Sequence, residues 1–292
     1  MMIIKNEKII KNMIGSSETI CETTFTFEEY EKIMPVHKKK INQEFLEYFV
    51  GLVEGSNALV LNVESDQIFF QLQYPKKDKR FLKELRTELG FGHVVDDPIN
   101  SRNTLYEISN EKGLERIIAI LNGNLCNMSQ QELFKAFLKT FNKKYGKSII
   151  FKEKNPEINL KTGWLSGFIE AQGIFFAYVQ YFPKKELLLK VPKIHLSFEL
   201  SCEFDTLKQI RGLFVRRDTH IKHHEFETYP TFEISNKIFR KKLIKYLQNY
   251  KLKTCKNRPY RAWVSAHSFL EKNKNPNEQS LQTLLNIVRR IR

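Results

Sequence analysis

Basic side chains gather in three clusters along the sequence, and side chains of this type can bind phosphate groups. Two of the clusters follow strand-like segments at matched places in the two halves of the chain. Such contacts give affinity for a nucleic acid without carrying information about its base sequence. A single lysine is usually only solvated, but recurrence at matched positions favours a binding role. The clusters are Lys76, Lys77, Lys79 and Arg80; Lys184, Lys185, Lys190 and Lys193; and Lys251, Lys253, Lys256, Arg258 and Arg261.

The charge of the whole chain supports this interpretation. Its 292 residues include 48 Lys and Arg against 33 Asp and Glu, which leaves a net charge of +15. Hydrophobic residues make up 41% of the chain and include 23 Phe, enough to build cores, so wholesale disorder is excluded. The length indicates about two domains. The expected partner of such a surface is a polyanion, most simply nucleic acid.

The sequence argues against a membrane-spanning, a secreted, a metal-binding and a disulfide-rich protein. No segment approaches the ~18 consecutive apolar residues of a membrane-spanning helix, and the amino terminus lacks the apolar core of a secretory signal. The histidines at 223 and 224 are adjacent, so on a strand they point apart, and with His220 and Glu225 they indicate a solvated strand end rather than a metal site. We therefore expect no metal, no disulfide framework and no membrane partner; the four cysteines are scattered at Cys21, Cys126, Cys202 and Cys255.

One segment of the first half recurs 116 residues later, since Glu47–Asn57 is echoed by Gly163–Gly173. The second strand-like run after each copy alternates between apolar and polar residues, which is typical of an antiparallel sheet buried on one face. Each half therefore predicts an α+β unit in the order α-β-β-α-β-β-α, with helices on one face of a four-stranded antiparallel sheet. The predicted strands are 58–63, 67–73, 105–108, 174–181, 193–200 and 231–234, and the predicted helices after the repeat are 78–89, 113–121, 204–214 and 237–247.

The repeat also sets the expected domain boundaries. Residues 1–44 form an amino-terminal extension, interpreted as a solvated tail that ends in the basic run 37–40. The two repeats span 45–141 and 160–270, and the Lys- and Asn-rich stretch 142–159 is the linker between them. Residues 271–292 form a basic carboxyl-terminal tail.

Small residues lie four positions apart in each copy of the repeated segment. Such a stripe lets two helix backbones approach closely. We therefore expect the two repeated helices to form a seam between the halves and to give a monomer with internal pseudo-twofold symmetry. The small residues are Gly51, Gly55, Gly167 and Ala171.

At these two helices the sequence resembles the LAGLIDADG homing endonuclease family in its single-chain, two-repeat form. The nine-residue motif aligns with 49–57 (FVGLVEGSN) and with 165–173 (LSGFIEAQG), and the second copy carries the closer likeness. The segments 121–125 and 246–256 also resemble family segments that follow each repeat. The likeness covers roughly residues 45–270 and preserves the order of the elements.

The resemblance implies a metal-dependent cleavage centre, because in the family the eighth motif position carries an Asp or Glu from each helix to hold divalent ions. Here those positions are Ser56 and Gln172, a hydroxyl and an amide, which are poor ligands for Mg²⁺. Glu54 and Glu170 lie two residues earlier and are expected to face away from this point. Lys256 matches a basic residue that assists cleavage. We therefore expect an intact fold with a degenerate active site.

The resemblance further implies that the outward faces of the two sheets lie along a nucleic acid. Gln71 and Gln73 would then contact base edges, and so would His195 and Ser197 in the second half. Tyr260 and Trp263 lie close to the third basic cluster, but their spacing of three suits the core-facing side of one helix.

The leading functional hypothesis is an RNA- or DNA-binding protein derived from a homing endonuclease, most simply a maturase that assists splicing of a group I intron. One alternative is an active homing endonuclease that cuts double-stranded DNA with Mg²⁺. Another is a structural component of a ribonucleoprotein particle such as an organellar ribosome. The composition, with 27 Ile against seven Ala, points to an AT-rich genome, either cellular or organellar; a mitochondrion or another organelle is the expected location.

Overall fold

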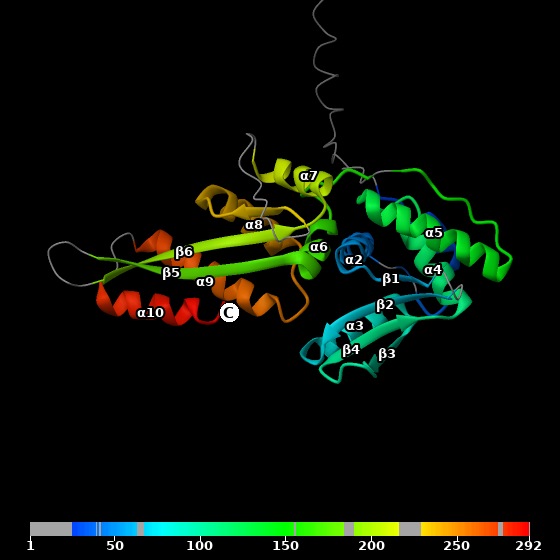
Figure 1. Cartoon of the computed structure of the whole chain (residues 1–292), viewed down its shortest axis with the longest axis horizontal. Helices are drawn as coiled ribbons and strands as arrows, with labels where there is room; N and C mark the ends of the chain where they lie inside the picture. Colours follow the sequence, from blue (N-terminus) through cyan, green and yellow to red (C-terminus); the bar gives the residue numbers. More distant parts are fainter. Residues whose placement is uncertain are drawn as a thin grey trace, which may run out of the picture.

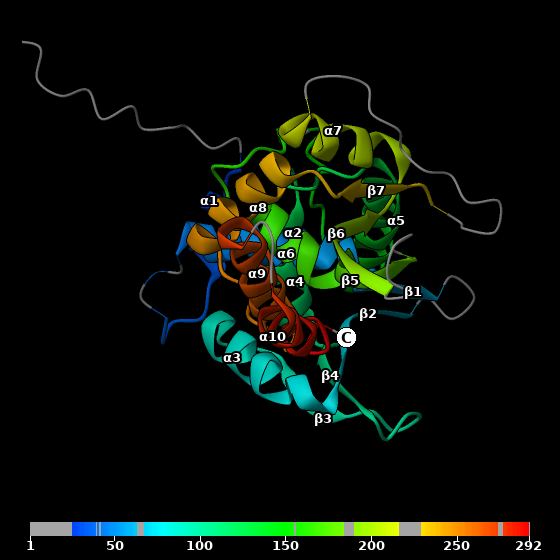
Figure 2. The ribbon, with the colours of Figure 1, turned by 90° about the vertical axis from the view of Figure 1, so that its left-hand side faces the viewer.

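The structure is a computed structural model, which describes residues 25–38, 40, 42–62, 67–154, 156–183, 190–215, 229–273 and 277–291. Within them the chain forms two α+β halves that lie side by side along its longest axis (Figure 1). The halves meet at α2 (Gln43–Ser56) and α6 (Trp164–Gln172), which also lie next to each other in the view turned by 90° (Figure 2). The predicted fold class, α+β with two antiparallel sheets and helices, is confirmed.

The first half contains an antiparallel sheet in the order β1-β2-β4-β3. Its alternating sequence explains the burial, because Ile68, Phe70 and Leu72 face the core while Gln71 and Gln73 face outward. The elements of this half are α1 (Glu28–Ile33), β1 (Leu59–Asn62), β2 (Gln67–Pro75), a 3-10 turn (Lys76–Asp78), α3 (Lys79–Leu89), β3 (His93–Asp96), β4 (Asn103–Ile108), α4 (Glu111–Leu121) and α5 (Met128–Tyr145).

The second half has an antiparallel sheet in the order β5-β6-β7 among the described residues. The sequence predicts a fourth strand here, and residues 216–228, between α7 and β7, lie outside the described part of the chain. His220, His223, His224 and Glu225 fall in that stretch. The elements of this half are β5 (Gly173–Pro183), β6 (Lys190–Ser201), α7 (Phe204–Phe214), β7 (Thr231–Ile234), α8 (Lys237–Asn249), α9 (Asn257–Lys272) and α10 (Glu278–Val288).

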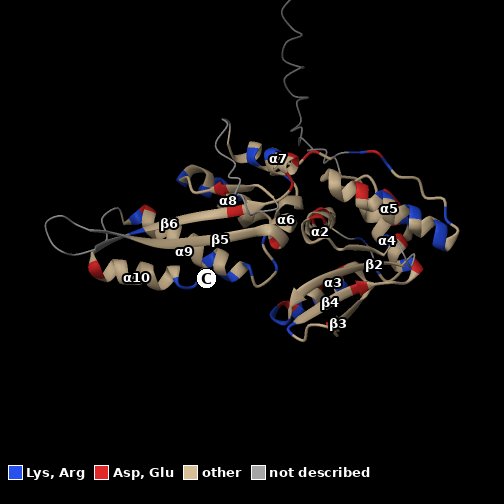
Figure 3. Cartoon of the chain, in the orientation of Figure 1, with Lys and Arg blue, Asp and Glu red and all other residues tan. Residues whose placement is uncertain are grey.

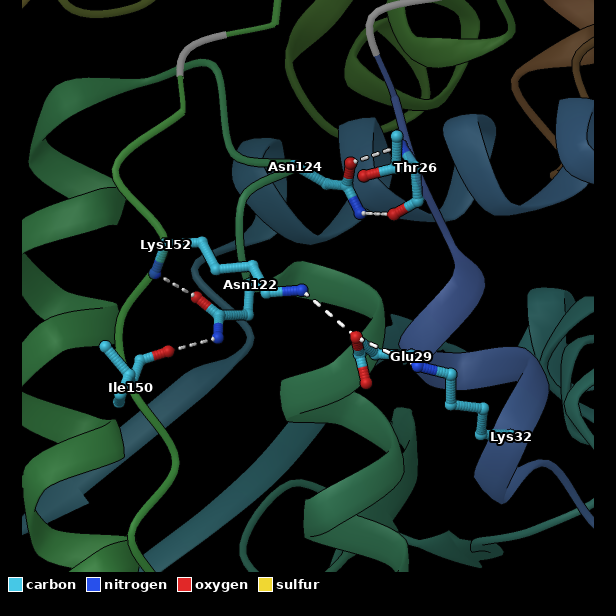
Figure 4. A network of polar contacts seen from close by, with 7 residues as sticks. All are labelled: Thr26, Glu29, Lys32, Asn122, Asn124, Ile150 and Lys152. Atoms are coloured by element: carbon cyan, nitrogen blue, oxygen red, sulfur yellow. Dashed lines mark hydrogen bonds and ion pairs between the residues drawn. The ribbon is translucent and has the colours of Figure 1, made fainter.

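The amino-terminal extension is not simply a solvated tail, contrary to the expectation from sequence. Phe25, Phe27 and Tyr30 are buried against the first half. Asn124 holds this segment, because its side chain accepts a hydrogen bond from the backbone N–H of Thr26 at 2.9 Å and donates one to its carbonyl at 2.7 Å (Figure 4). Residues from about 25 onward therefore belong to the core of this half.

A second asparagine of the same turn holds the linker. The side chain of Asn122 donates to the carbonyl of Ile150 and accepts from the N–H of Lys152, both at 2.8 Å (Figure 4). Gly123, between the two asparagines, has a positive φ of 83°, a conformation that glycine adopts without strain. The segment 121–125, which carries part of the family resemblance, thus binds the amino-terminal segment through Asn124 and the linker through Asn122.

Two predicted boundaries need correction. Helix α5 extends to Tyr145, so the first residues of the predicted linker are helical; its apolar stripe of Phe134, Phe137, Leu138 and Phe141 is buried. The predicted carboxyl-terminal tail forms α10, whose Leu284 and Val288 are buried and which packs on α9. None of the helices that the structure describes is long and apolar enough to cross a membrane.

Candidate nucleic-acid interface and helix seam

Helices α2 and α6 approach so closely that only glycine fits at two positions. A Cβ atom added to Gly51 would lie 1.9 Å from the backbone oxygen of Trp164, and one added to Gly167 would lie 1.8 Å from that of Tyr48. The two contacts are related by the internal repeat, since each pairs the third motif position with the residue preceding the other motif. Gly55 faces the Ala171 side chain farther along the same stripe.

Each motif helix also carries a buried carboxylate that binds three or four donors. Glu54 accepts the backbone N–H groups of Cys126 at 2.7 Å and Asn127 at 2.6 Å, and the indole N–H of Trp164 at 2.5 Å. The first two donors belong to the loop after α4 of its own half, whereas the third comes from the other half. Glu54 therefore holds its own loop and the opposite helix together.

Glu170 repeats this arrangement in the second half. It accepts the backbone N–H groups of Lys253 and Thr254 and the hydroxyl of Thr254 at 2.5 Å. It also accepts the hydroxyl of Tyr48, from the other half, at 3.3 Å. The acids at the sixth motif position thus build the seam, a role that sequence reasoning missed because the donors lie more than 70 residues farther along the chain.

Burial raises the pKa of both carboxyls. The pKa of Glu54 rises from 4.5 to about 8 because its desolvation outweighs the three hydrogen bonds that favour the anion. Desolvation also raises the pKa of Glu170, against the opposing effect of its bonds to Thr254 and Lys253. Both groups are enclosed in the protein, so neither is presented to an external ligand.

The eighth motif positions lie at the carboxyl ends of the two helices. The hydroxyl of Ser56 donates to the carbonyl of Leu52 at 2.6 Å, and the amide of Gln172 donates across the seam to the carbonyl of Gly55 at 2.5 Å. Neither residue offers an anionic oxygen to a metal ion. The hydroxyl of Ser56 and the amide N–H of Gln172 each donate a hydrogen bond to a backbone carbonyl. The donor set therefore does not fit Mg²⁺, and among the described residues no group of three or more His, Cys, Asp or Glu is placed to hold a metal.

Lys256 lies against α6 rather than on an open surface. Its ammonium donates to the carbonyl of Ile169 at 2.9 Å, and desolvation lowers its pKa from 10.5 to about 8, opposed by the nearby Glu170. The hydrogen bonds to Glu54 and Glu170 make Asn127 and Thr254 equivalent, so the residue equivalent to Lys256 in the first half is Ser129. A phosphate contact by Lys256, expected from the sequence, would have to use the donors that the Ile169 carbonyl leaves available on a half-buried ammonium.

The outward faces of the two sheets differ from each other. Gln71 and Gln73 lie on the outer face of β2, where Gln73 donates to the Asp97 carboxylate at 2.7 Å. On β6, His195 stacks on Tyr178 with ring centroids 4.6 Å apart. Ser197 also lies on the outer side, but its neighbours cover it and only 3% of it is exposed, so it is not available to contact a base, contrary to the expectation.

The basic clusters are partly occupied by ion pairs. Lys76 and Lys79 both approach Asp96, at 3.9 and 2.7 Å, and Arg80 pairs with Glu84 at 2.8 Å. Lys77, Lys193 and Arg258 are exposed, and Lys253 places its ammonium 5.3 Å from the centre of the Tyr48 ring. Basic residues concentrate on helices and at strand ends rather than along the strands (Figure 3). Lys184 and Lys185 lie outside the described residues, and the side chain of Lys190 is likewise not described.

Sequence reasoning missed an apolar row on the outer face of β5. Ile174, Phe176 and Tyr178 are exposed to 58%, 42% and 41%. Their spacing of two within a predicted strand, alternating with Phe175 and Ala177, was the available signal. The expectation that Tyr260 and Trp263 belong to the core agrees with their exposed fractions of 7% and 0%.

Comparisons of the sequence and of the structure with known proteins show which proteins share this fold. Residues 165–267 match the sequence model described as LAGLIDADG endonuclease. A structure of the LAGLIDADG meganuclease I-AabMI bound to uncleaved DNA has a TM-score of 0.68 at 16% identity, covering 86% of this chain and 99% of that one. The fold of the chain is therefore that of two-domain LAGLIDADG meganucleases.

Two relatives extend the comparison along the sequence. A Neurospora crassa protein named probable intron-encoded endonuclease 4 is 26% identical over 240 residues, which cover 82% of this chain and 42% of that protein. An uncharacterized cox1 intron-2 37.2 kDa protein of Schizosaccharomyces pombe is 25% identical over 280 residues, covering 92% of this chain and 80% of that protein. The chain thus spans less than half the length of the Neurospora relative. The likeness to these two relatives extends over most of this chain.

Proposed function

We propose that this protein binds nucleic acid without cutting it and serves as a maturase for a group I intron. The observation that carries the proposal is the pair Ser56 and Gln172 at the foot of the seam. A hydroxyl and an amide that both bond to backbone carbonyls leave no anionic ligand for a divalent ion. The net charge of +15 and the exposed basic residues remain suited to a polyanion.

The structure around Ser56 and Gln172 supports a protein that still binds nucleic acid rather than one that has lost its function. The seam glycines, the two buried glutamates and the cores of both halves are all in place. A nucleic-acid-binding role needs this framework but no metal site. The cox1 intron name of one relative is the reason to propose a mitochondrial location and an intron as the source of the bound RNA.

The test of the maturase role is a splicing assay with the precursor RNA that contains the intron encoding this chain. We expect the purified protein to bind that RNA and to increase the fraction spliced at low Mg²⁺, where a group I intron folds poorly alone. A protein that binds the RNA but leaves splicing unchanged contradicts the maturase role. A protein that does not bind RNA contradicts the broader proposal, provided that it also fails to bind duplex DNA.

The second candidate is an active homing endonuclease, favoured by the name of the Neurospora relative. The double variant Ser56→Asp with Gln172→Glu tests whether acids at these two positions decide the binding of Mg²⁺, which this candidate requires. We expect calorimetry to detect Mg²⁺ binding by the double variant and none by the wild type. The two single variants are the matched controls, since one carboxylate alone should bind Mg²⁺ much more weakly than two.

A further inference from the structure

The outer face of β5 carries a row of exposed apolar side chains that the buried seam does not use. Ile174, Phe176 and Tyr178 alternate with the core residues of the strand, and each is more than 40% exposed. Strand β5 contains no charged residue at all, as the uninterrupted tan ribbon shows (Figure 3). Contiguous exposed apolar side chains on a folded protein usually mark a contact surface.

The two aromatic side chains of this row contact each other, and Tyr178 also contacts His195 of the neighbouring strand. The ring centroids of Phe176 and Tyr178 lie 5.8 Å apart at 40°, and the ring of Tyr178 stacks on His195 at 4.6 Å and 5°. Tyr178 and His195 are also register partners of β5 and β6. Among the described contacts, Nε2 of His195 has no hydrogen-bond partner. The three rings therefore form one continuous platform, which we call the aromatic platform.

Charge differs between the two ends of the aromatic platform. Ile174 pairs with Glu199 at the end nearest the seam, whereas Gln180 pairs with the exposed Lys193 at the far end. The charged residues beside the row are therefore acidic near the seam and basic at the far end of β5 and β6. With a net charge of +15, a second copy of this chain is disfavoured as the occupant.

The first half shows that the fold does not require these rings. The positions equivalent to Phe176 and Tyr178, 116 residues earlier on β1, are Val60 and Asn62. Both halves build a strand here with apolar inward residues, Leu59 and Leu61 in β1 and Phe175 and Ala177 in β5, yet only the second half places aromatic side chains outward. The platform is thus an addition to the shared scaffold.

We propose that the aromatic platform stacks the unpaired bases of a single-stranded RNA segment. Every base has a flat face that stacks on an aromatic ring, but in a duplex these faces are covered by neighbouring pairs. His195 covers one face of Tyr178, so the exposed aromatic surface belongs to Phe176 and to the uncovered part of Tyr178. This surface carries no charge, so it suits exposed bases better than a phosphate backbone. The proposal rests on the proposed nucleic-acid-binding function and names the form of RNA that the second half holds.

The test compares a single-stranded RNA of about twelve nucleotides with the duplex that it forms with its complement. We expect Phe176→Ala with Tyr178→Ala to weaken binding of the single strand about tenfold or more, and binding of the duplex less than about threefold. Fluorescence anisotropy measures both affinities. A 2-aminopurine base in the single strand should be quenched by the wild type and not by the variant, which reports stacking directly.

Two further variants keep the result interpretable. Phe176→Tyr with Tyr178→Phe retains both rings and should bind the single strand like the wild type. Val60→Ala with Asn62→Ala changes the equivalent positions of the first half and should leave quenching unchanged. Because the two rings are about 40% exposed and otherwise packed, their truncation should lower the melting temperature, so binding is compared at a temperature at which circular dichroism shows both proteins to be folded.

The outcomes separate this proposal from the proposed function. Equal losses for single strand and duplex, or no loss, overturn the aromatic platform while leaving nucleic-acid binding intact. Wild-type protein that binds neither RNA contradicts the proposed function itself. A wild-type dimer in sedimentation that the double alanine variant abolishes overturns the platform in favour of a protein contact.

Discussion

The two halves of the molecule agree at their seam and differ on their outer faces. At the seam, Gly51 faces the backbone of Trp164 just as Gly167 faces that of Tyr48, and Glu54 and Glu170 bind equivalent loops. On the outer faces, amides of β2 contrast with the aromatic rings of β5. Packing constrains residues that must fit a symmetric partner, whereas a surface that contacts an asymmetric ligand is free to diverge.

The largest expected effect on stability comes from the two glycine contacts between α2 and α6. Gly51→Ala and Gly167→Ala each place a Cβ within 2 Å of a backbone oxygen, which cannot move like a side chain. We expect each to lower the free energy of unfolding by about 3 kcal/mol or more, measured by urea denaturation. Gly212→Ala in α7 is the control, because its Cβ meets nothing within 4 Å and alanine favours a helix. A seam variant as stable as this control contradicts the close-approach account.

The two motif glutamates should respond differently to replacement by glutamine. Oε2 of Glu54 faces the indole N–H of Trp164, which can only donate, whereas Oε2 of Glu170 faces a hydroxyl that can also accept. We expect Glu54→Gln to cost about 2–3 kcal/mol of stability and Glu170→Gln about 1 kcal/mol or less. Thermal and urea unfolding of the two variants measure the difference. Equal costs show that the donors around the two acids are interchangeable.

The raised pKa of Glu54 predicts how stability depends on pH. Because the folded-state value of about 8 exceeds the ordinary 4.5, the folded protein retains a proton that the unfolded chain releases between these values. This contribution is complete below pH 4.5 and is lost as the pH rises through 8. The stability of the wild type relative to Glu54→Gln should therefore fall by about 1–3 kcal/mol between pH 6 and pH 9. A difference that stays constant between pH 6 and pH 9 means that the three donors keep the carboxyl ionised throughout this range.

A smaller effect is expected at the basic cluster of the first half. Asp96→Asn removes the partner of Lys76 and Lys79, so both ammonium groups become available to phosphates. We expect duplex affinity to rise about two- to fivefold at low salt, with a steeper salt dependence, and stability to change by less than about 1 kcal/mol. Glu132→Gln, which releases Lys135 on α5, is the matched control and should leave affinity unchanged. Equal gains in both variants would mean that net charge alone, and not this cluster, sets the affinity.

The repeated motif and the alternating strands made most of the fold predictable. The predicted helix over 204–214 coincides with α7, and the glycine at 90 ends α3 with a positive φ of 82°. Helix α5 was missed although Asn127 caps it and a stripe from Phe134 to Phe141 marks its buried face. Strand β3 was missed because its sequence, HVVD, places two apolar residues side by side and shows no alternation.

The candidate site was less predictable because its partners are distant in sequence. The donors to Glu54 and Glu170 come from loops and from the opposite helix, so no local spacing reveals them. Alternation placed Ser197 on the correct face of β6 but could not show that its neighbours cover it. Whether an outward residue is accessible depends on the size of its cross-strand neighbours, here Phe176.

The central claim, binding without metal-dependent cutting, is tested by selecting tight binders from random pools of duplex DNA and of RNA. Each selected ligand is then incubated with the bound protein in Mg²⁺ and in Mn²⁺, with the Ser56→Asp, Gln172→Glu double variant in parallel. We expect the ligands to be recovered uncut by the wild type at every metal concentration. Metal-dependent strand breaks at a fixed position, made by the wild-type protein, contradict the account.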